Sequence, residues 1–259
     1  MEATDPVGYV AAMGLVLRVQ DGFTHGEIEV RPEMWAPGTD RLRMGILATV
    51  ADIVAGSLPE QALTPTVDLR LQLLTRPPAS GTVHAVCRPV RHGRRLYVGE
   101  TWLDAGDPSN PFARATVTFL NQTFGAAPGF PRREETPLGA VSFDAIFRAR
   151  FPRRGVAEID PHPWICNGPG GPVQGGAQAY LAELAAERAL RDAALAVADL
   201  DVRYLSRTGA APLRATATVL AHDPSAAAVR VELVERGSED RIAALVVLGY
   251  RRDPSGRSR

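Results

Sequence analysis

One carboxylate stands alone in an apolar segment of this 259-residue chain. Asp52 is the single charged residue of ILATVADIVA, residues 46–55, in which Thr49 is the one other polar side chain. A helix that is apolar on every side is normally buried, and a buried carboxylate is costly unless it is paired or used. Burial would raise the pKa of this carboxyl group toward the range useful for acid–base chemistry. The alternative is a structural role, in which Asp52 caps another element or pairs with a buried arginine.

A glycine-rich segment in the second half of the chain has the composition of an anion-binding site. Residues 168–176, GPGGPVQGG, lead directly into AQAYLAELAAERALRD, a run rich in good helix formers. The first N–H groups of a helix are unpaired, the helix dipole makes that end partly positive, and glycine lets a ligand oxygen come close to the backbone. We therefore predict that Gln174, Gly175 and Gly176 begin a helix whose amides bind an anion. A flexible loop before a helix is the alternative.

The composition excludes several classes of partner. Hydrophobic residues make up 45% of the chain and charged residues 22%, and the formal net charge is +0, so no overall positive field attracts nucleic acid or an anionic membrane. The sequence contains no apolar run long enough to span a bilayer and no N-terminal apolar signal segment. Cys87 and Cys166 are too few for a disulfide framework and lack metal-ligand spacing. We expect a cytoplasmic protein without a metal site.

The two halves of the sequence resemble each other. A shift of 131 residues places Gly45 on Gly176 and Asp52 on Glu183. Without a gap, the same shift places VDLRLQLLTR, residues 67–76, on ADLDVRYLSR, residues 198–207, with four identical pairs. So many matches at one offset indicate an internal duplication.

The repeat sets the expected domain boundaries. The N-terminal domain takes residues 1–124, the C-terminal domain takes residues 140–259, and the Pro-, Gly- and charge-rich residues 125–139 between them are typical of a linker.

Each copy has one predicted helix among several predicted strands. The helices cover residues 45–55 and 176–191. Alternation of apolar and polar residues favours antiparallel strands with one buried face, and a single helix among strands favours an α+β fold with the helix packed on a sheet. The expected strands cover residues 15–19, 27–31, 66–74, 82–90, 96–103 and 113–120 in the first copy and residues 200–205, 213–220, 229–234 and 242–248 in the second.

At this point the chain resembles a known family. The order of elements, the Gln174-Gly175-Gly176 turn and an acidic residue seven positions after its last glycine resemble hotdog-fold thioesterases, in particular PaaI-like acyl-CoA thioesterases. VDLRLQLLTR and RHGRRL, residues 91–96, also resemble that group's post-helix strand and Gly-Arg turn. The resemblance implies two hotdog units in tandem, each an antiparallel sheet wrapped around one central helix. It further implies an acyl-CoA substrate and allows a homodimer of the whole chain.

The resemblance also implies two composite sites, in which the acid of one copy faces the helix N-terminus of the other. The first combines Asp52 with Gln174, Gly175 and Gly176. Its glycines would expose amides to the thioester oxygen, where negative charge develops, and Asp52 would act as general base or as nucleophile.

The second composite site departs from the pattern. It combines Glu183 with Arg43, Met44 and Gly45, so that methionine replaces the first glycine and arginine replaces the glutamine. Glu183 also lies in a charged stretch of its predicted helix, and a solvated helix face is the alternative to a catalytic role. We expect this site to be degraded.

Thr66 and three arginines complete the candidate residues of the first site. Thr66 takes a position at which relatives often carry a hydroxyl near the base, although it could simply begin a strand. Arg91, Arg94 and Arg95 could bind coenzyme A phosphates through charge-assisted hydrogen bonds, although an arginine-rich hairpin is often plain surface. Asn167 precedes the glycine run as an asparagine does in relatives, but lies one residue further out.

Other chemistries lack a signal. The five histidines are scattered, no nucleophile–His–Asp pattern or dinucleotide fingerprint occurs, and we expect no bound cofactor. The expected activity is therefore hydrolysis of an acyl-CoA thioester. Two alternatives remain: a non-enzymatic module that binds acyl-CoA or an acyl carrier, and a hotdog hydratase or dehydratase, although no Asp and His pair follows either glycine turn.

Overall fold

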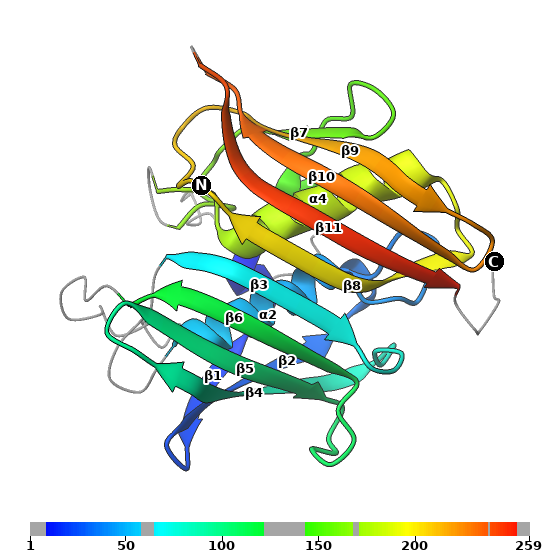
Figure 1. The fold of residues 1–259 in the computed structure, drawn as a ribbon. Coiled ribbons are helices and arrows are strands. Elements are labelled where there is room, and N and C mark those ends of the chain that lie inside the picture. Colours follow the sequence, from blue (N-terminus) through cyan, green and yellow to red (C-terminus); the bar gives the residue numbers. More distant parts are fainter. Residues whose placement is uncertain (1–8, 58–64, 122–142, 168–170, 238, 253–259) are drawn as a thin grey trace, which may run out of the picture.

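The computed structural model describes residues 9–57, 65–121, 143–167, 171–237 and 239–252. Its strands form one antiparallel sheet in the order β1-β2-β4-β5-β6-β3-β8-β11-β10-β9-β7 (Figure 1). The expected linker, residues 125–139, lies outside the described residues. The strands are β1 (Val16–Gln20), β2 (Phe23–Val30), β3 (Thr66–Leu73), β4 (Gly81–His92), β5 (Leu96–Asp104), β6 (Ala113–Leu120), β7 (Val156–Ile159), β8 (Leu195–Tyr204), β9 (Leu213–His222), β10 (Ala226–Glu235) and β11 (Arg241–Arg252).

Both halves of the sequence contribute to this sheet, and they meet where β3 pairs with β8. In that pair Leu71 lies opposite Leu200 and Leu69 lies opposite Val202, and all four side chains are fully buried. Outward from the pair, β6, β5, β4 and β2 follow on one side, and β11, β10, β9 and β7 follow on the other. The order of strands is therefore alike on the two sides, with β1 added beyond β2.

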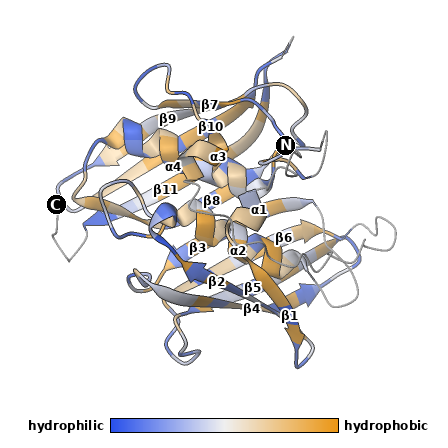
Figure 2. Cartoon of the chain, turned by 180° about the vertical axis from the view of Figure 1, so that it is seen from behind, coloured by the Kyte–Doolittle hydropathy of each residue, from blue (hydrophilic) through white to orange (hydrophobic). Residues whose placement is uncertain are grey.

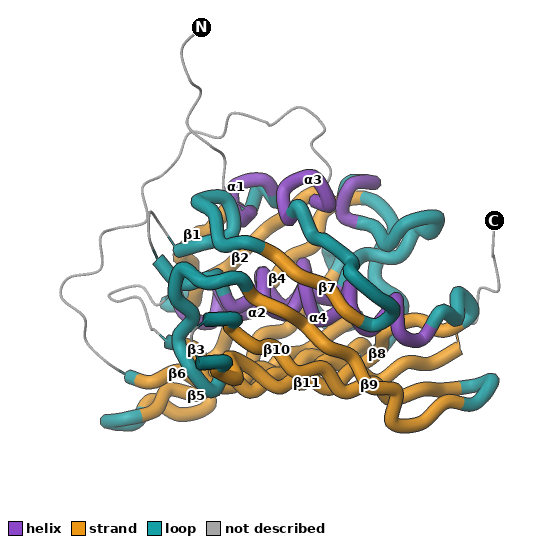
Figure 3. The backbone as a smooth tube through the Cα atoms, turned by 90° about the horizontal axis from the view of Figure 1, so that it is seen from above, coloured by secondary structure: helices purple, strands orange, loops and turns teal. Residues whose placement is uncertain are grey.

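Two long helices, α2 (Met44–Gly56) and α4 (Gly175–Leu190), lie side by side on one face of the sheet (Figure 3). Every residue of α2 except Ile53 is buried, as the apolar sequence of the segment predicts. Short helices α1 (Tyr9–Ala12) and α3 (Phe143–Phe147) cover the other side of these helices, and the 3-10 helix η1 (Pro32–Met34) precedes the approach to α2.

The core lies between the helices and the sheet. Ile46, Leu47 and Val50 of α2 and Leu181 of α4 are completely buried, and Figure 2 shows apolar residues along the helices and strands, with hydrophilic residues mainly in loops and at strand ends. Among the described residues, no helix has the length and apolarity needed to cross a membrane.

The predicted elements differ from the observed ones mainly in the second half. Both long helices begin and end within one residue of their predicted bounds. Strand β8 begins at Leu195, five residues before the predicted start at residue 200, because its first residues pair with the end of β11. Strand β7 and helices α1 and α3 were not predicted, since segments of four or five residues carry too little periodicity to detect.

Candidate active site

Asp52 lies near the end of α2 with its carboxylate directed at the start of α4. The residue is 8% exposed, and Thr66, the first residue of β3, donates a hydrogen bond from Oγ1 to Asp52 Oδ1 at 2.7 Å. Burial raises the pKa of Asp52 to about 6, and the hydrogen bond from Thr66 opposes that rise. No described residue forms an ion pair with Asp52. A carboxylate in this environment can take up a proton near neutral pH.

The start of α4 presents two free amides to this carboxylate. Gln174 is the N-cap of the helix, and its Oε1 accepts the hydrogen bond of the Ala177 amide at 2.9 Å. Among the described residues, no acceptor binds the amides of Gly175 or Gly176, the two residues between them. A Cβ atom built on Gly175 would lie 3.5 Å from Oδ2 of Asp52. In the described part of the chain, the helix therefore begins with unpaired donors beside a carboxylate that forms no ion pair.

The two glycines serve different purposes. A Cβ atom on Gly176 would lie 1.8 Å from Oγ1 and 2.8 Å from Cα of Thr49, in the neighbouring helix. We expected this glycine to leave room for a ligand, but the structure shows that the close approach of α2 requires it. A Cβ atom on Gly175 would lie 3.1 Å from the Tyr204 hydroxyl, its nearest neighbour, and it would face the carboxylate of Asp52.

Tyr204, which was not predicted as a site residue, completes the arrangement. Its hydroxyl donates a hydrogen bond to the carbonyl oxygen of Gly175 at 2.9 Å. Burial, with the charge of Asp52 as the next cause, raises the pKa of Tyr204 well above its ordinary value, so it stays a neutral donor. The repeat gives a signal that could have found it, because Tyr204 takes the place of Leu73 in the first copy.

Glu183, the counterpart of Asp52, is also buried but is fully bonded. It is 2% exposed, so the expected alternative of a solvated helix face is wrong. Its carboxylate accepts hydrogen bonds from the amides of Met44 at 3.2 Å and Gly45 at 2.8 Å. The amide of Met44 can therefore bind an anion despite the methionine side chain. The anion that it binds here is the carboxylate of Glu183.

Arg43 adds a cation to this cluster. Its guanidinium group, 2% exposed, lies 3.9 Å from Glu183 and 3.1 Å from Glu187. Burial raises the pKa of Glu183, whereas Arg43 and the two amides favour its charged form. The side chain of Arg43, the N-cap residue of α2, makes no capping hydrogen bond. The carboxylate of Glu183 in α4 caps the N-terminus of α2 instead.

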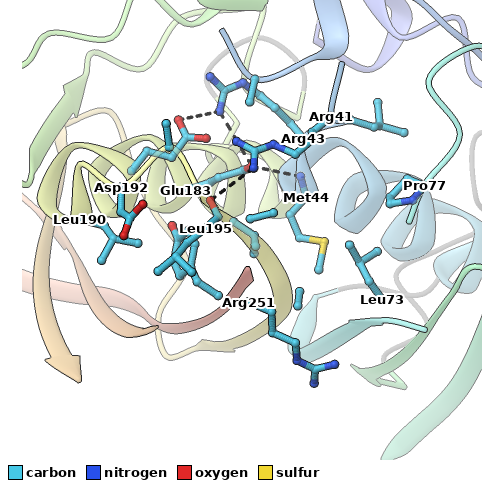
Figure 4. Close-up of a pocket in the computed structure, with 18 of the residues that line it drawn as sticks. Arg41, Arg43, Met44, Leu73, Pro77, Glu183, Leu190, Asp192, Leu195 and Arg251 are labelled. Atoms are coloured by element: carbon cyan, nitrogen blue, oxygen red, sulfur yellow. Dashed lines mark hydrogen bonds and ion pairs between the residues drawn. The ribbon is translucent and has the colours of Figure 1, made fainter. Parts of the chain in front are cut away.

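A cavity of about 810 Å³ opens beside Glu183 (Figure 4). The residues before α2, the end of α4 and the strand ends of β3, β8 and β11 line it. Arg43, Met44 and Glu183 border it, whereas Asp52, Thr66 and the residues 174–176 do not. This cavity thus belongs to the second composite site, the one expected to be degraded.

The arginine-rich turn lies at the end of the sheet where β3 begins. Thr66 is opposite Phe119, and Phe119 is opposite Tyr97 at the start of β5. Two strand spacings of about 4.8 Å, roughly 10 Å, therefore separate Thr66 from Tyr97, and the turn between β4 and β5 lies beyond Tyr97. In that turn and its flanks the three expected residues, Arg91, Arg94 and Arg95, are exposed.

Two further expectations concern other residues. Asn167 is exposed, and its amide donates to the carbonyl oxygen of Pro172, while residues 168–170 lie outside the described residues. The structure does not bring Asn167 into contact with Asp52. Within the described parts of the chain, no group of histidine, cysteine and acidic side chains could hold a metal ion.

Comparison with solved structures places the chain among hotdog proteins. No protein-family model matches the sequence, and no curated protein sequence matches it. The fold is similar to a protein with a hot dog fold from Alicyclobacillus acidocaldarius, with a TM-score of 0.63, 14% identity, and coverage of 95% of this chain and 99% of the other.

The solved structures of a TesB protein and of an acyl-CoA thioesterase II share the same fold. The TesB protein of Mycobacterium avium subspecies paratuberculosis superposes with a TM-score of 0.70 at 16% identity, over 95% of this chain and 98% of the other. An acyl-CoA thioesterase II from Mycobacterium marinum superposes with a TM-score of 0.59 at 14% identity, over 95% and 99% of the two chains. At such identities the likeness establishes the hotdog fold alone.

Proposed function

We propose that the protein hydrolyses an acyl-CoA thioester, with residues 1–124 and 140–259 as tandem hotdog units and one working site between them. The site consists of Asp52 and Thr66 from the first unit with Gln174, Gly175, Gly176 and Tyr204 from the second. The observation that carries the proposal is the carboxylate of Asp52, buried without a cationic partner and directed at the free amides of α4. The similar structure described as an acyl-CoA thioesterase II supports the same activity.

In this proposal each group of the site has a role. The thioester carbonyl oxygen accepts from the amides at the start of α4, which stabilise the negative charge that develops as the tetrahedral intermediate forms. In the first route Asp52 takes a proton from the attacking water and returns it to the sulfur as the carbon–sulfur bond breaks, so that coenzyme A leaves as the thiol. In the second route Asp52 attacks the carbonyl carbon, the carbon–sulfur bond breaks, and the thiolate leaves and takes a proton from solvent. Water then hydrolyses the anhydride between the acyl group and Asp52, which regenerates the carboxylate. Both routes require an ionised Asp52 and consume one water for each thioester.

Thr66 and Tyr204 position these groups. The Thr66 hydroxyl fixes one oxygen of Asp52, and the Tyr204 hydroxyl binds the Gly175 carbonyl. A hydrogen bond to that carbonyl holds the peptide at the start of α4, and so orients the amide donors. The exposed arginines of the β4–β5 turn, Arg91, Arg94 and Arg95, lie at this end of the sheet and are the groups that would bind the coenzyme A phosphates.

Glu183 is less suited to catalysis for a physical reason. Its carboxylate already occupies the two amides at the start of α2, so these donors have no free hydrogen for a substrate carbonyl. Burial raises the pKa of Glu183 even though Arg43 opposes that rise, so its basicity does not exclude it, and the assignment depends on the occupied amides. We therefore assign hydrolysis to the Asp52 site.

The proposal is tested by incubating the purified full chain with acyl-CoAs of increasing chain length and measuring thiol release with a chromogenic thiol reagent. Turnover that Asp52→Asn abolishes supports it. Saturable binding of acyl-CoA without thiol release from any member of the panel would show that the protein is a binding module instead.

A further inference from the structure

The two composite sites differ by an exchange of side-chain size. At the second composite site, Met44 begins α2 and Leu73 ends β3, and both residues line the cavity. The repeat offset places Gly175 on Met44 and Tyr204 on Leu73. The first composite site therefore combines the smallest residue with a large aromatic one, where the second combines two apolar side chains of intermediate size.

The tip of the Tyr204 side chain takes the space into which a side chain of residue 175 would point. A Cβ atom on Gly175 would lie 3.1 Å from the Tyr204 hydroxyl, 3.2 Å from Cζ of the same ring and 3.5 Å from Oδ2 of Asp52. The hydrogen bond to the Gly175 carbonyl, at 2.9 Å, holds the ring there. A methionine side chain at this point, such as Met44 has in α2, would leave no room for the ring. The tyrosine thus forms a wall beside the carboxylate.

Tyr204 lies on the side of Asp52 that faces away from the arginine-rich turn. The strands follow in the order β4-β5-β6-β3-β8, with the turn between β4 and β5, Thr66 at the start of β3 and Tyr204 at the end of β8. Because β3 and β8 are antiparallel and Asp68 is opposite Arg203, Tyr204 lies beside the start of β3. In the proposed function the turn binds the phosphates of coenzyme A, so the acyl group of an extended thioester points toward Tyr204.

We propose that Tyr204 determines which acyl chains the enzyme accepts, because its ring closes the acyl end of the first composite site. A short acyl group fits between Asp52 and the ring, whereas a long one would have to displace a side chain that is packed against the core and held by a hydrogen bond. The ring is half-buried, which leaves part of its surface to contact the ligand. This inference rests on the proposed hydrolysis and names its substrate class, a short-chain acyl-CoA.

The test compares the kcat/KM of octanoyl-CoA with that of butyryl-CoA. The wild type should prefer butyryl-CoA. Tyr204→Leu introduces the residue type of Leu73, and we expect the octanoyl-to-butyryl ratio to rise at least ~10-fold, the scale on which a hydrophobic pocket discriminates a single methylene. The ratio is used because loss of the hydroxyl lowers the turnover of both substrates. A wild type that hydrolyses octanoyl-CoA as efficiently as butyryl-CoA, or an unchanged ratio in Tyr204→Leu, would overturn the inference.

Two control variants separate the ring from the hydroxyl and from the other site. Tyr204→Phe removes only the hydroxyl and should lower kcat with an unchanged ratio, and a rise as large as that of Tyr204→Leu would refute a role of ring size. Tyr250→Leu makes the same exchange beside the cavity of the second site and should also leave the ratio unchanged. A ratio that rises in Tyr250→Leu alone would place hydrolysis at that cavity. Should Tyr204→Leu lack a thermal transition, Tyr204→Met takes its place.

Binding measurements separate this inference from the proposed function. The butyl and octyl thioethers of coenzyme A cannot be hydrolysed, and calorimetric titration gives their Kd ratio for the wild type and for Tyr204→Leu. If no acyl-CoA releases thiol but the ratio shifts toward the octyl thioether by at least ~10-fold in the variant, hydrolysis is refuted and Tyr204 still limits the chain. Thiol release with the same ratio in both proteins would refute the inference and leave hydrolysis standing.

Discussion

Gly45 lies against Tyr180 in the same way that Gly176 lies against Thr49. A Cβ atom on Gly45 would come within 2.5 Å of the Tyr180 Cα, and one on Gly176 within 2.8 Å of the Thr49 Cα. The repeat offset relates these two contacts to each other, since it places Gly45 on Gly176 and Thr49 on Tyr180. The helices therefore cross through two reciprocal glycine contacts, closer than any residue with a side chain allows.

This crossing determines where the two acids lie. Asp52 and Glu183 each follow the glycine of their own helix by seven residues, which is about two turns. Each carboxylate consequently reaches the N-terminus of the other helix, where Asp52 faces Gly175 and Glu183 binds the amides of Met44 and Gly45. The close contact of the helices is thus a condition for both sites.

Substitution of the two adjacent glycines should separate stability from activity. Gly176→Ala places a methyl group against the backbone of α2, and we expect it to lower the free energy of unfolding by about 3 kcal/mol, as overpacking does. In Gly175→Ala the new methyl group would lie 3.1 Å from the Tyr204 hydroxyl, and we expect this variant to fold normally. Its thiol release should be reduced, because the methyl group lies beside the carboxylate of Asp52. Thermal unfolding and the thiol assay give the two quantities. A stable Gly176→Ala variant would contradict the described helix contact.

Thr66→Val should move the pH dependence of turnover. The Thr66 hydroxyl lowers the pKa of Asp52 against the effect of burial, so its removal raises that pKa further. Because the reaction requires the ionised carboxylate, turnover should fall at a higher pH in the variant than in the wild type, whose acid limb is expected near the Asp52 pKa of about 6. Thr66→Ser keeps the hydroxyl and should restore the wild-type profile. An unshifted profile would assign Thr66 a merely structural role.

Among the predicted candidate residues, Asp52 and the glycines each disturb a local pattern. Asp52 interrupts an apolar helix, and the glycines stand at the start of another, so single segments were enough to propose them. Thr66 fits an ordinary strand start and was proposed from the family resemblance. The pairing of Asp52 with the start of α4 depended on the family resemblance and the duplication, because no local pattern links residues more than a hundred positions apart.

The cavity could not be predicted for the opposite reason. Its wall is assembled from loop, helix and strand ends that lie far apart in the sequence, and arginines on such ends look like ordinary surface. Glu183 was also misjudged as a candidate for a solvated face, since its neighbours in sequence are charged. Only the packing of α4 on α2 shows that it is buried.

Arg94→Gln together with Arg95→Gln tests the binding of coenzyme A. If these arginines hold its phosphates, they contribute equally to the substrate and to the transition state, so KM should rise far more than kcat falls. We expect an increase in KM of about tenfold and a KM that rises with salt in the wild type. Thiol release at varied acyl-CoA and ionic strength measures both. An unchanged KM would assign the turn to ordinary surface.

Exchange of each acid for its amide should change stability in opposite directions. Burial raises the folded-state pKa of Asp52 above its ordinary value of 3.8, so the folded protein binds more protons between pH 3.8 and about 6, and stability falls as pH rises through that window. Asp52→Asn removes this penalty, and at pH 8 it should stabilise the protein by on the order of 2 kcal/mol. Burial raises the pKa of Glu183 as well, but Glu183→Gln turns an NH2 group toward the amides of α2 and leaves Arg43 with Glu187 alone. We expect these losses to exceed the relief of the burial penalty and to destabilise the protein by on the order of 2–4 kcal/mol.

The same two variants should show the reverse order in activity. Asp52→Asn removes the charge needed for a base or nucleophile, so turnover should fall by at least ~100-fold, the scale of lost acid–base catalysis, although the variant is the more stable of the two. Glu183→Gln should keep most of the turnover, because its carboxylate is occupied by the amides of α2. Assays at a temperature below both unfolding transitions exclude loss through unfolding. If Glu183→Gln abolished thiol release while Asp52→Asn spared it, the reaction would belong to the cavity beside Glu183 and the assignment to Asp52 would be wrong.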